Sequence, residues 1–127
     1  MDGISLLLVE DNVLNQKLIF LTLSKYGFKI DVANNGKEAL DKLKVKSYDI
    51  ILMDLMMPVM DGLEATRNIR KRDQETGNRN IIIGLTANTY DADRDKCLKE
   101  GMDEYMSKPF DIDVFKEIIA QFDFQIN

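Results

Sequence analysis

The chain has 127 residues, of which 45% are apolar, and this length suits one domain with a hydrophobic core. Its net charge is −5, from 22 acidic and 17 basic residues without a basic stripe, which argues against nucleic-acid binding by this segment. The sequence has no histidine and one cysteine, Cys97, which excludes Ser-His and Cys-His nucleophile pairs, the usual zinc sites and an internal disulfide.

Composition also limits location and chemistry. No apolar run approaches the roughly 18 residues that a membrane span requires. A lone cysteine fits a reducing compartment, so we expect a cytoplasmic protein without direct membrane contact. Any catalysis must use carboxylates, lysine, hydroxyl groups or a hard metal ion.

Five short apolar runs alternate with five helical patterns, which is typical of repeated βα units. The first run, Ile4–Val9, precedes a helix that we expect from Asn12 to Tyr26. This helix has one set of apolar residues at helical spacing and a second set beside it: Leu14, Leu18 and Leu21, then Ile19, Leu23 and Tyr26. The next run, Lys29–Ala33, alternates apolar and polar residues, which predicts a strand with one buried face.

Two helix starts with the capping-box pattern surround the third strand. Asn35-Gly-Lys-Glu38 opens the second helix, and Asp61-Gly-Leu-Glu64 opens a third helix that we expect to end near Glu75. Between them, Ile50–Asp54 is an apolar run that ends in a carboxylate. This run is a strand that carries an acid to the edge of the sheet.

The remaining elements are a fourth strand at Ile81–Thr86, a helix at Asp91–Glu100 with a thin apolar stripe, and a short strand at Glu104–Ser107. The last helix has the clearest apolar face, formed by Phe115, Ile118, Ile119 and Phe122 at i, i+3, i+4 and i+7.

The apolar content of the strands predicts their order. The first, third and fourth runs are nearly continuous, as expected of central strands covered on both faces, whereas the second alternates and the fifth is short. With right-handed crossovers, the simplest arrangement is a five-stranded parallel sheet of order 2-1-3-4-5, doubly wound with five helices in the flavodoxin-like manner. Ligands of such α/β sheets bind beyond the carboxyl ends of the strands.

Polar side chains follow the strands at that edge. Glu10 and Asp11 follow the first strand, Asp54 ends the third, Thr86 ends the fourth, and Lys108 follows the fifth. Each has an ordinary explanation alone: a helix cap for the acid pair, a β-former for the threonine and a solvated surface lysine. Because the topology brings all of them to one rim, we expect a single pocket.

The chemistry of this set favours phosphoryl transfer. Crowded carboxylates repel one another unless a cation lies between them, and their hard oxygens suit Mg²⁺. Mg²⁺ opposite Lys108 would form a positive clamp for a phosphoryl group. A carboxylate such as Asp54 can be the nucleophile, and the reaction needs no histidine base.

With these residues, the chain resembles the response-regulator receiver domains of two-component signalling. The motifs that carry the resemblance are Glu10-Asp11, Asp54, Met57-Pro58 with Asp61-Gly62, Thr86-Ala87 and Lys108-Pro109. The similarity covers essentially all of residues 1–127, which we expect to form a single receiver domain. As a set the motifs are highly specific.

The resemblance implies a role for each position. Asp54 would accept a phosphoryl group from a phosphohistidine on a partner protein. Asp11 and Asp54 would bind Mg²⁺, with Glu10 acting directly or through water and the Met56 carbonyl completing the protein ligands. The remaining roles are phosphoryl binding by Lys108 with a cis bond to Pro109, a hydroxyl switch at Thr86 and an aromatic switch at Tyr105.

Finer motifs resemble the receivers of hybrid histidine kinases, namely Glu10-Asp11-Asn12 with Asn15-Gln16, Leu85 to Asn88, and Cys97 to Asp103. This implies two partners, the dimerisation domain that carries a kinase's phosphohistidine and a histidine phosphotransfer domain. It also implies a domain excised from a longer hybrid kinase, cytoplasmic or the cytoplasmic part of a membrane-bound one. A free-standing single-domain regulator is the alternative.

Other classes fit less well. An aspartate-nucleophile phosphohydrolase needs a second acid two residues after the nucleophile, where this chain has Met56. A flavodoxin-type carrier would place FMN phosphate against Glu10 and Asp11, which would repel it. A degenerate receiver used only for docking would not need the intact acids. We therefore expect a phosphoacceptor that assists its own phosphorylation and dephosphorylation, and not an enzyme.

Overall fold

The structure, a computed structural model, describes residues 3–87, 91–122 and 124, with the backbone alone for 91–93. Asn88, part of one motif above, lies outside these residues. The strands are β1 (Ser5–Val9), β2 (Lys29–Ala33), β3 (Ile50–Asp54), β4 (Ile81–Thr86) and β5 (Glu104–Ser107). The helices are α1 (Val13–Ser24), α2 (Gly36–Val45), α3 (Gly62–Thr76), α4 (Asp91–Lys99) and α5 (Ile112–Ala120).

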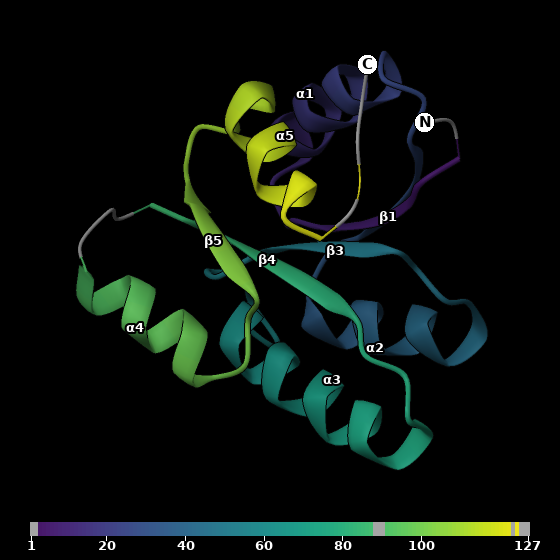
Figure 1. Cartoon of the computed structure of the whole chain (residues 1–127), viewed down its shortest axis with the longest axis vertical. Helices are drawn as coiled ribbons and strands as arrows, with labels where there is room; N and C mark the ends of the chain where they lie inside the picture. The colour runs from purple at the N-terminus through teal and green to yellow at the C-terminus, as the bar shows by residue number, and fades with distance from the viewer. Residues whose placement is uncertain (1–2, 88–90, 123, 125–127) are drawn as a thin grey trace.

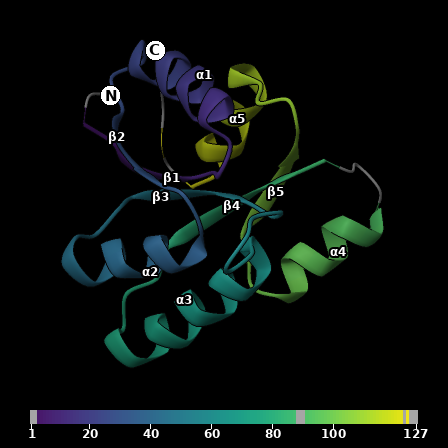
Figure 2. The same ribbon diagram turned by 180° about the vertical axis from the view of Figure 1, so that it is seen from behind.

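The strands form one parallel sheet in the order β2-β1-β3-β4-β5, which confirms the predicted fold. Helices α1 and α5 cover one face, and α2, α3 and α4 cover the other (Figure 1). The view from behind in Figure 2 shows the same two layers. None of the described helices has the length and apolar content to cross a bilayer.

The core is divided by the sheet because successive strand residues point to opposite faces. Leu6, Leu8 and Leu52 pack with α1 and α5, whereas Leu7 and Met53 pack with α2, α3 and α4. Every residue of β3 is buried, as its continuous apolar run predicts. Asp54 is therefore presented by the most enclosed strand of the sheet.

Helix α1 is apolar around most of its circumference, so its sequence did not indicate which side would face the sheet. The structure buries Ile19 and Leu23. The other set remains outside, with Leu14, Leu18 and Leu21 at 65%, 55% and 61% exposure. An apolar surface therefore runs along the outer side of α1.

The predicted helix caps are present. The Asn35 and Asp61 side chains accept hydrogen bonds from the backbone N–H groups of Glu38 and Glu64, each at 2.9 Å. The Glu38 carboxylate accepts from the Asn34 N–H at 3.2 Å, one residue earlier than in a standard capping box.

The loop between β3 and α3 is tightly folded under Asp54. A Cβ atom on Gly62 would lie 2.3 Å from the Asp54 carbonyl oxygen, so only glycine fits there. The Met60 N–H donates to the Pro58 carbonyl at 2.7 Å, and the intervening Val59 has φ of 69°. This is a γ-turn, a strained conformation for a β-branched residue.

Candidate phosphorylation site

The carboxyl ends of the strands bring the predicted residues together. Asp54 is the last residue of β3 and Thr86 is the last of β4. Glu10 follows β1, and Lys108 follows β5. In the sheet register, Val9 lies beside Met53, which places the two acid-bearing strand ends next to each other.

Three carboxylates form a compact cluster in this pocket. Oxygen atoms of Glu10, Asp11 and Asp54 all lie within 4.8 Å of one another. Glu10 and Asp54 are each 1% exposed, whereas Asp11 is exposed. The cluster thus has two buried carboxylates at its bottom and one exposed carboxylate, that of Asp11, at its opening.

Lys108 supplies the positive charge. Its Nζ lies 2.9 Å from Asp54 Oδ1 and 4.0 Å from Glu10 Oε2. Asp54 Oδ1 also accepts a hydrogen bond from the Met56 N–H at 3.2 Å, while the Met56 side chain is 75% exposed. The Lys108–Pro109 peptide bond is cis, as the resemblance implies. One oxygen of Asp54 is therefore held by two donors.

The second oxygen of Asp54 has no such support. Asp54 Oδ2 and Glu10 Oε2 are buried and have no hydrogen-bond partner among the described residues. Burial raises the pKa of Glu10 from 4.5 to about 7, and the Asp54 carboxylate acts in the same direction. The Asn12 N–H and Lys108 oppose this rise in pKa. The single positive charge of Lys108 does not neutralise the three carboxylates of this cluster.

Two unpartnered buried carboxylate oxygens beside a third, exposed carboxylate are what a hard divalent cation requires. The donors are all oxygen atoms, and the open side at Asp11 leaves space for water ligands. The residues present therefore fit Mg²⁺.

The two expected switch residues lie on the neighbouring strands β4 and β5. Thr86 is buried at the end of β4, beside Ser107 in the register. Tyr105 is half-buried in β5, beside Gly84. Strand β5 leads directly to Lys108, whose N–H donates to the Thr86 carbonyl at 2.8 Å.

Polar residues of α1 support the site in a way that sequence reasoning did not assign. Asn12 caps the helix by accepting from the Asn15 N–H at 3.0 Å. The Asn12 N–H and Asn15 Nδ2 both donate to Glu10 Oε1, at 3.2 and 3.5 Å. Gln16 Nε2 donates to the Glu10 carbonyl and to Asn34 Oδ1. The spacing of Asn12, Asn15 and Gln16 on one helix side was the available signal.

Together the fold and the site define a doubly wound α/β domain with an acidic, lysine-bearing pocket at the carboxyl ends of its strands. The chain belongs to the response regulator receiver domain family, whose model matches residues 6–120. The resemblance inferred from the motifs is thereby confirmed.

Among the relatives of this chain are histidine kinases that are much longer than it. The chain is 39% identical over 123 residues to hybrid signal transduction histidine kinase K of Dictyostelium discoideum, covering 93% of this chain and 10% of that protein. It is 37% identical to histidine kinase 5 of Arabidopsis thaliana, covering 92% of this chain and 15% of that protein. The chain thus spans a small part of the length of these relatives.

Solved structures agree in fold. The receiver domain of Ssk1 from Saccharomyces cerevisiae, crystallised with the histidine phosphotransfer protein Ypd1, matches with a TM-score of 0.87 and 34% identity over 93% of this chain and 88% of that one. The receiver domain of the sensor kinase PA1611 from Pseudomonas aeruginosa PAO1 matches with a TM-score of 0.83 and 42% identity, over 94% and 96%. The latter structure has a magnesium ion in its active-site cleft.

Proposed function

We propose that Asp54 is the phosphoacceptor of this receiver domain in a phosphorelay. The observation that carries this proposal is the asymmetry of its carboxylate. Oδ1 is fixed by Lys108 and the Met56 N–H, while Oδ2 is buried beside Glu10 without a hydrogen-bond partner among the described residues. An Asp54 oxygen attacks the phosphorus of a phosphohistidine, a P–O bond forms, the P–N bond breaks, and its electron pair returns to the imidazole nitrogen.

The other site residues neutralise charge. Asp11, Asp54 and Glu10, the last directly or through water, would hold Mg²⁺ together with the Met56 carbonyl. When bound, Mg²⁺ supplies positive charge beside the phosphoryl oxygens. Lys108, already 2.9 Å from Asp54, pairs with a phosphoryl oxygen from the other side. The Thr86 hydroxyl donates a hydrogen bond to the phosphoryl group. Tyr105 changes position together with Thr86, and this movement alters the surface formed by α4, β5 and α5.

The exposed side of α1 is suited to the phosphohistidine partner. A cavity of about 400 Å³ reaches from Glu10 and Lys108 to Leu18 and Phe110, so the site is continuous with the apolar surface of α1. Helical phosphohistidine domains, both the kinase dimerisation domain and a histidine phosphotransfer domain, could pack an apolar ridge here and reach Asp54. The Ssk1–Ypd1 complex supports a phosphotransfer partner of this kind.

The domain acts as an acceptor that assists its own phosphorylation, and not as an enzyme with a separate substrate. A phosphohydrolase would use an acid at the position of Met56, whose side chain instead extends into solvent. Similarity to hybrid kinases supports a place within a longer hybrid kinase, with the domain in the cytoplasm. No partner other than a phosphohistidine protein is needed for the reaction.

Acetyl phosphate with Mg²⁺ provides the first test. Intact mass spectrometry should detect one added phosphoryl group on the wild type and none on Asp54→Ala. A phosphoryl group that survives the substitution would refute Asp54 as the acceptor.

Partner docking is tested separately. Leu14→Ser with Leu18→Ser should slow transfer from a phosphorylated histidine phosphotransfer protein and leave the rate with acetyl phosphate unchanged. The matched control is Leu98→Ser, which changes an exposed apolar residue of α4 on the other face of the sheet. If Leu98→Ser slowed transfer from the phosphotransfer protein equally, α1 would be ruled out as the docking surface.

A further inference from the structure

A second cleft of about 400 Å³ lies at the end of the sheet opposite Asp54. It is formed by the end of α2 and the following loop, Leu43 to Tyr48, and by the second half of α3 with Asn78 to Asn80. These segments precede β3 and β4, so the cleft shares no residue with the phosphorylation site. The proposed function leaves it unused.

The charge of this cleft is opposite to that of the chain. Four cationic side chains line it: Lys44, Lys46, Arg72 and Arg79. Its one lining carboxylate, Asp73, is buried and already bonded to Arg70 at 2.8 Å and to the Asn80 amide at 2.6 Å. In a chain of net charge −5, this cleft concentrates positive charge.

Arg79 is ion-paired with Asp103 at 2.5 Å, whereas the other three cations are available to a ligand. Lys44 lies 3.7 Å from Asp41 and Lys46 lies 3.0 Å from Asp31, and both lysines are more than half exposed. Exposed ion pairs of this kind contribute little and exchange readily. Arg72 is half-buried, and its guanidinium forms no hydrogen bond or ion pair with any residue that the structure describes.

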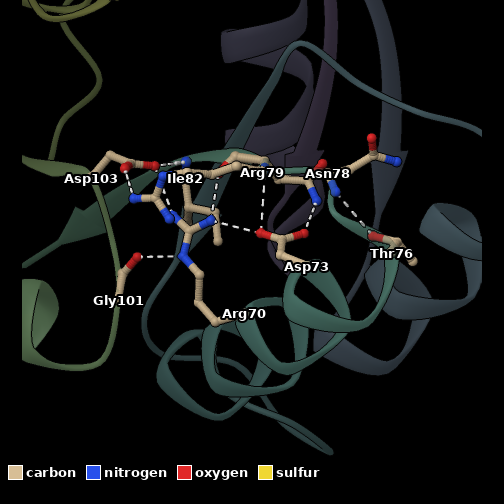
Figure 3. Close-up of polar contacts among 9 residues, drawn as sticks. Arg70, Asp73, Thr76, Asn78, Arg79, Ile82, Gly101 and Asp103 are labelled. Atoms are coloured by element: carbon tan, nitrogen blue, oxygen red, sulfur yellow. Dashed lines mark hydrogen bonds and ion pairs between the residues drawn. The ribbon is translucent and has the colours of Figure 1, made fainter.

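A polar network centred on Arg70 lies beside the cleft and shares Asp73 and Asn80 with its lining; Figure 3 shows its contacts. The Arg70 guanidinium donates to the carbonyls of Gly101 and Asn80, at 2.7 and 2.6 Å, and to Asp73 and Asp103, both at 2.8 Å. It thereby joins α3 to the start of β4 and to the turn before β5. Because Asp73 and Asn80 are fixed in this way, this side of the cleft needs little ordering when a ligand binds.

The cleft also has an apolar part. Leu43 is half-buried and Val45 at the rim is 88% exposed, whereas Tyr48 and Ile69, at 7% and 0% exposure, belong to the core beneath. Helices α2 and α3 both end here, so their carbonyl ends disfavour a small anion deep in the cleft. The long cationic side chains instead reach outward around an apolar base. This combination suits carboxylates along an extended chain that carries an apolar side chain.

We propose that this cleft docks an acidic peptide segment of a partner protein. An apolar side chain of the segment packs against Leu43 and Val45. Flanking carboxylates pair with Lys44, Lys46 and Arg72. Charge complementarity selects the segment, and the apolar contact fixes its register.

The test uses the whole chain labelled with ¹⁵N and a synthetic peptide, acetyl-Glu-Asp-Glu-Leu-Asp-Glu-amide. Saturable shift changes should map to residues 43–48 and 69–80 and should weaken at higher salt. The uncharged counterpart, acetyl-Gln-Asn-Gln-Leu-Asn-Gln-amide, should bind far more weakly. Asp54→Ala should bind the acidic peptide as the wild type does, so a failure of the phosphoacceptor proposal does not affect this result.

Matched variants on α3 distinguish the effect of losing a cation inside the cleft from the effect of changing the net charge of the chain. Arg72→Gln should weaken binding roughly two- to fivefold, and adding Lys46→Gln should weaken it by a similar factor again. Lys71→Gln removes one charge from the next residue, which does not line the cleft, and should leave binding unchanged. A thermal melt of each variant checks its fold.

Three results would overturn the proposal. One is the absence of saturable shifts, and another is equal weakening by Arg72→Gln and Lys71→Gln. The third is binding of pyrophosphate at the same residues as tightly as the peptide, which would make the cleft a small-anion site.

Discussion

Replacing Glu10 by glutamine should raise the free energy of unfolding at pH 8, in metal-free buffer, by about 3 kcal/mol. Burial and the adjacent Asp54 carboxylate raise the pKa of Glu10 from 4.5 to about 7. Each unit of difference between folded and unfolded pKa corresponds to about 1.36 kcal/mol. Glutamine keeps an oxygen for the Asn12 N–H and adds a donor that can reach Asp54.

The sign of the pH effect follows from the raised pKa. Below pH 4.5 the Glu10 carboxyl is protonated in both the folded and the unfolded chain, so it does not favour either state. Between pH 4.5 and about 7 the unfolded chain loses this proton first, and the folded state becomes progressively less stable. The wild type should therefore lose stability over this window relative to Glu10→Gln, with the difference constant above it.

Urea unfolding followed by circular dichroism, with EDTA present and at pH values from 4 to 8, measures this difference. Subtracting the two stability curves removes most contributions of other groups. Glu75→Gln, an exposed glutamate of α3, is the matched control and should follow the wild type. Parallel curves for wild type and Glu10→Gln would refute the electrostatic account of the cluster.

Three further substitutions test other parts of the site. Lys108→Met removes the cation 2.9 Å from Asp54, so the affinity for Mg²⁺ measured by calorimetry should rise by a factor on the order of ten. Phosphorylation by acetyl phosphate should become slower. An unchanged affinity would contradict the idea that Lys108 and Mg²⁺ neutralise the same carboxylates. Gly62→Ala places a Cβ 2.3 Å from a backbone oxygen and should lower the free energy of unfolding in urea by about 3 kcal/mol or more. Gly77→Ala should lower it by about 1 kcal/mol, because only the positive φ of 79° opposes alanine there. Val59→Gly should stabilise the protein by about 1 kcal/mol because it relieves the γ-turn, and a lower thermal midpoint would argue against strain there.

Much of the fold could be predicted from periodicity and strand composition. The apolar runs of β1, β3 and β4 identified the central strands, and the topology then brought Asp54, Thr86 and Lys108 to one edge. Helix α1 shows the limit of this reasoning. Because it is apolar on nearly all sides, spacing predicted a helix but not that Leu14 would face solvent.

Contacts between distant segments were beyond sequence reasoning. A Cβ atom on Gly84 of β4 would lie 2.6 Å from the sulfur of Met102, which is in the turn before β5. The Arg70–Asp103 pair joins residues 33 positions apart. The unpartnered oxygens of Glu10 and Asp54 likewise depend on exact placement, which spacing does not give.

The central claim is that the phosphoryl group is carried on Asp54. The most direct measurement transfers phosphate from a phosphorylated histidine phosphotransfer protein, traps the acyl phosphate by borohydride reduction and locates the product by peptide sequencing in a mass spectrometer. Reduction should convert the acceptor aspartate at position 54 to homoserine, and only after incubation with the phosphorylated partner. Homoserine at position 11 instead, or no reduced residue despite loss of phosphate from the partner, would contradict the account.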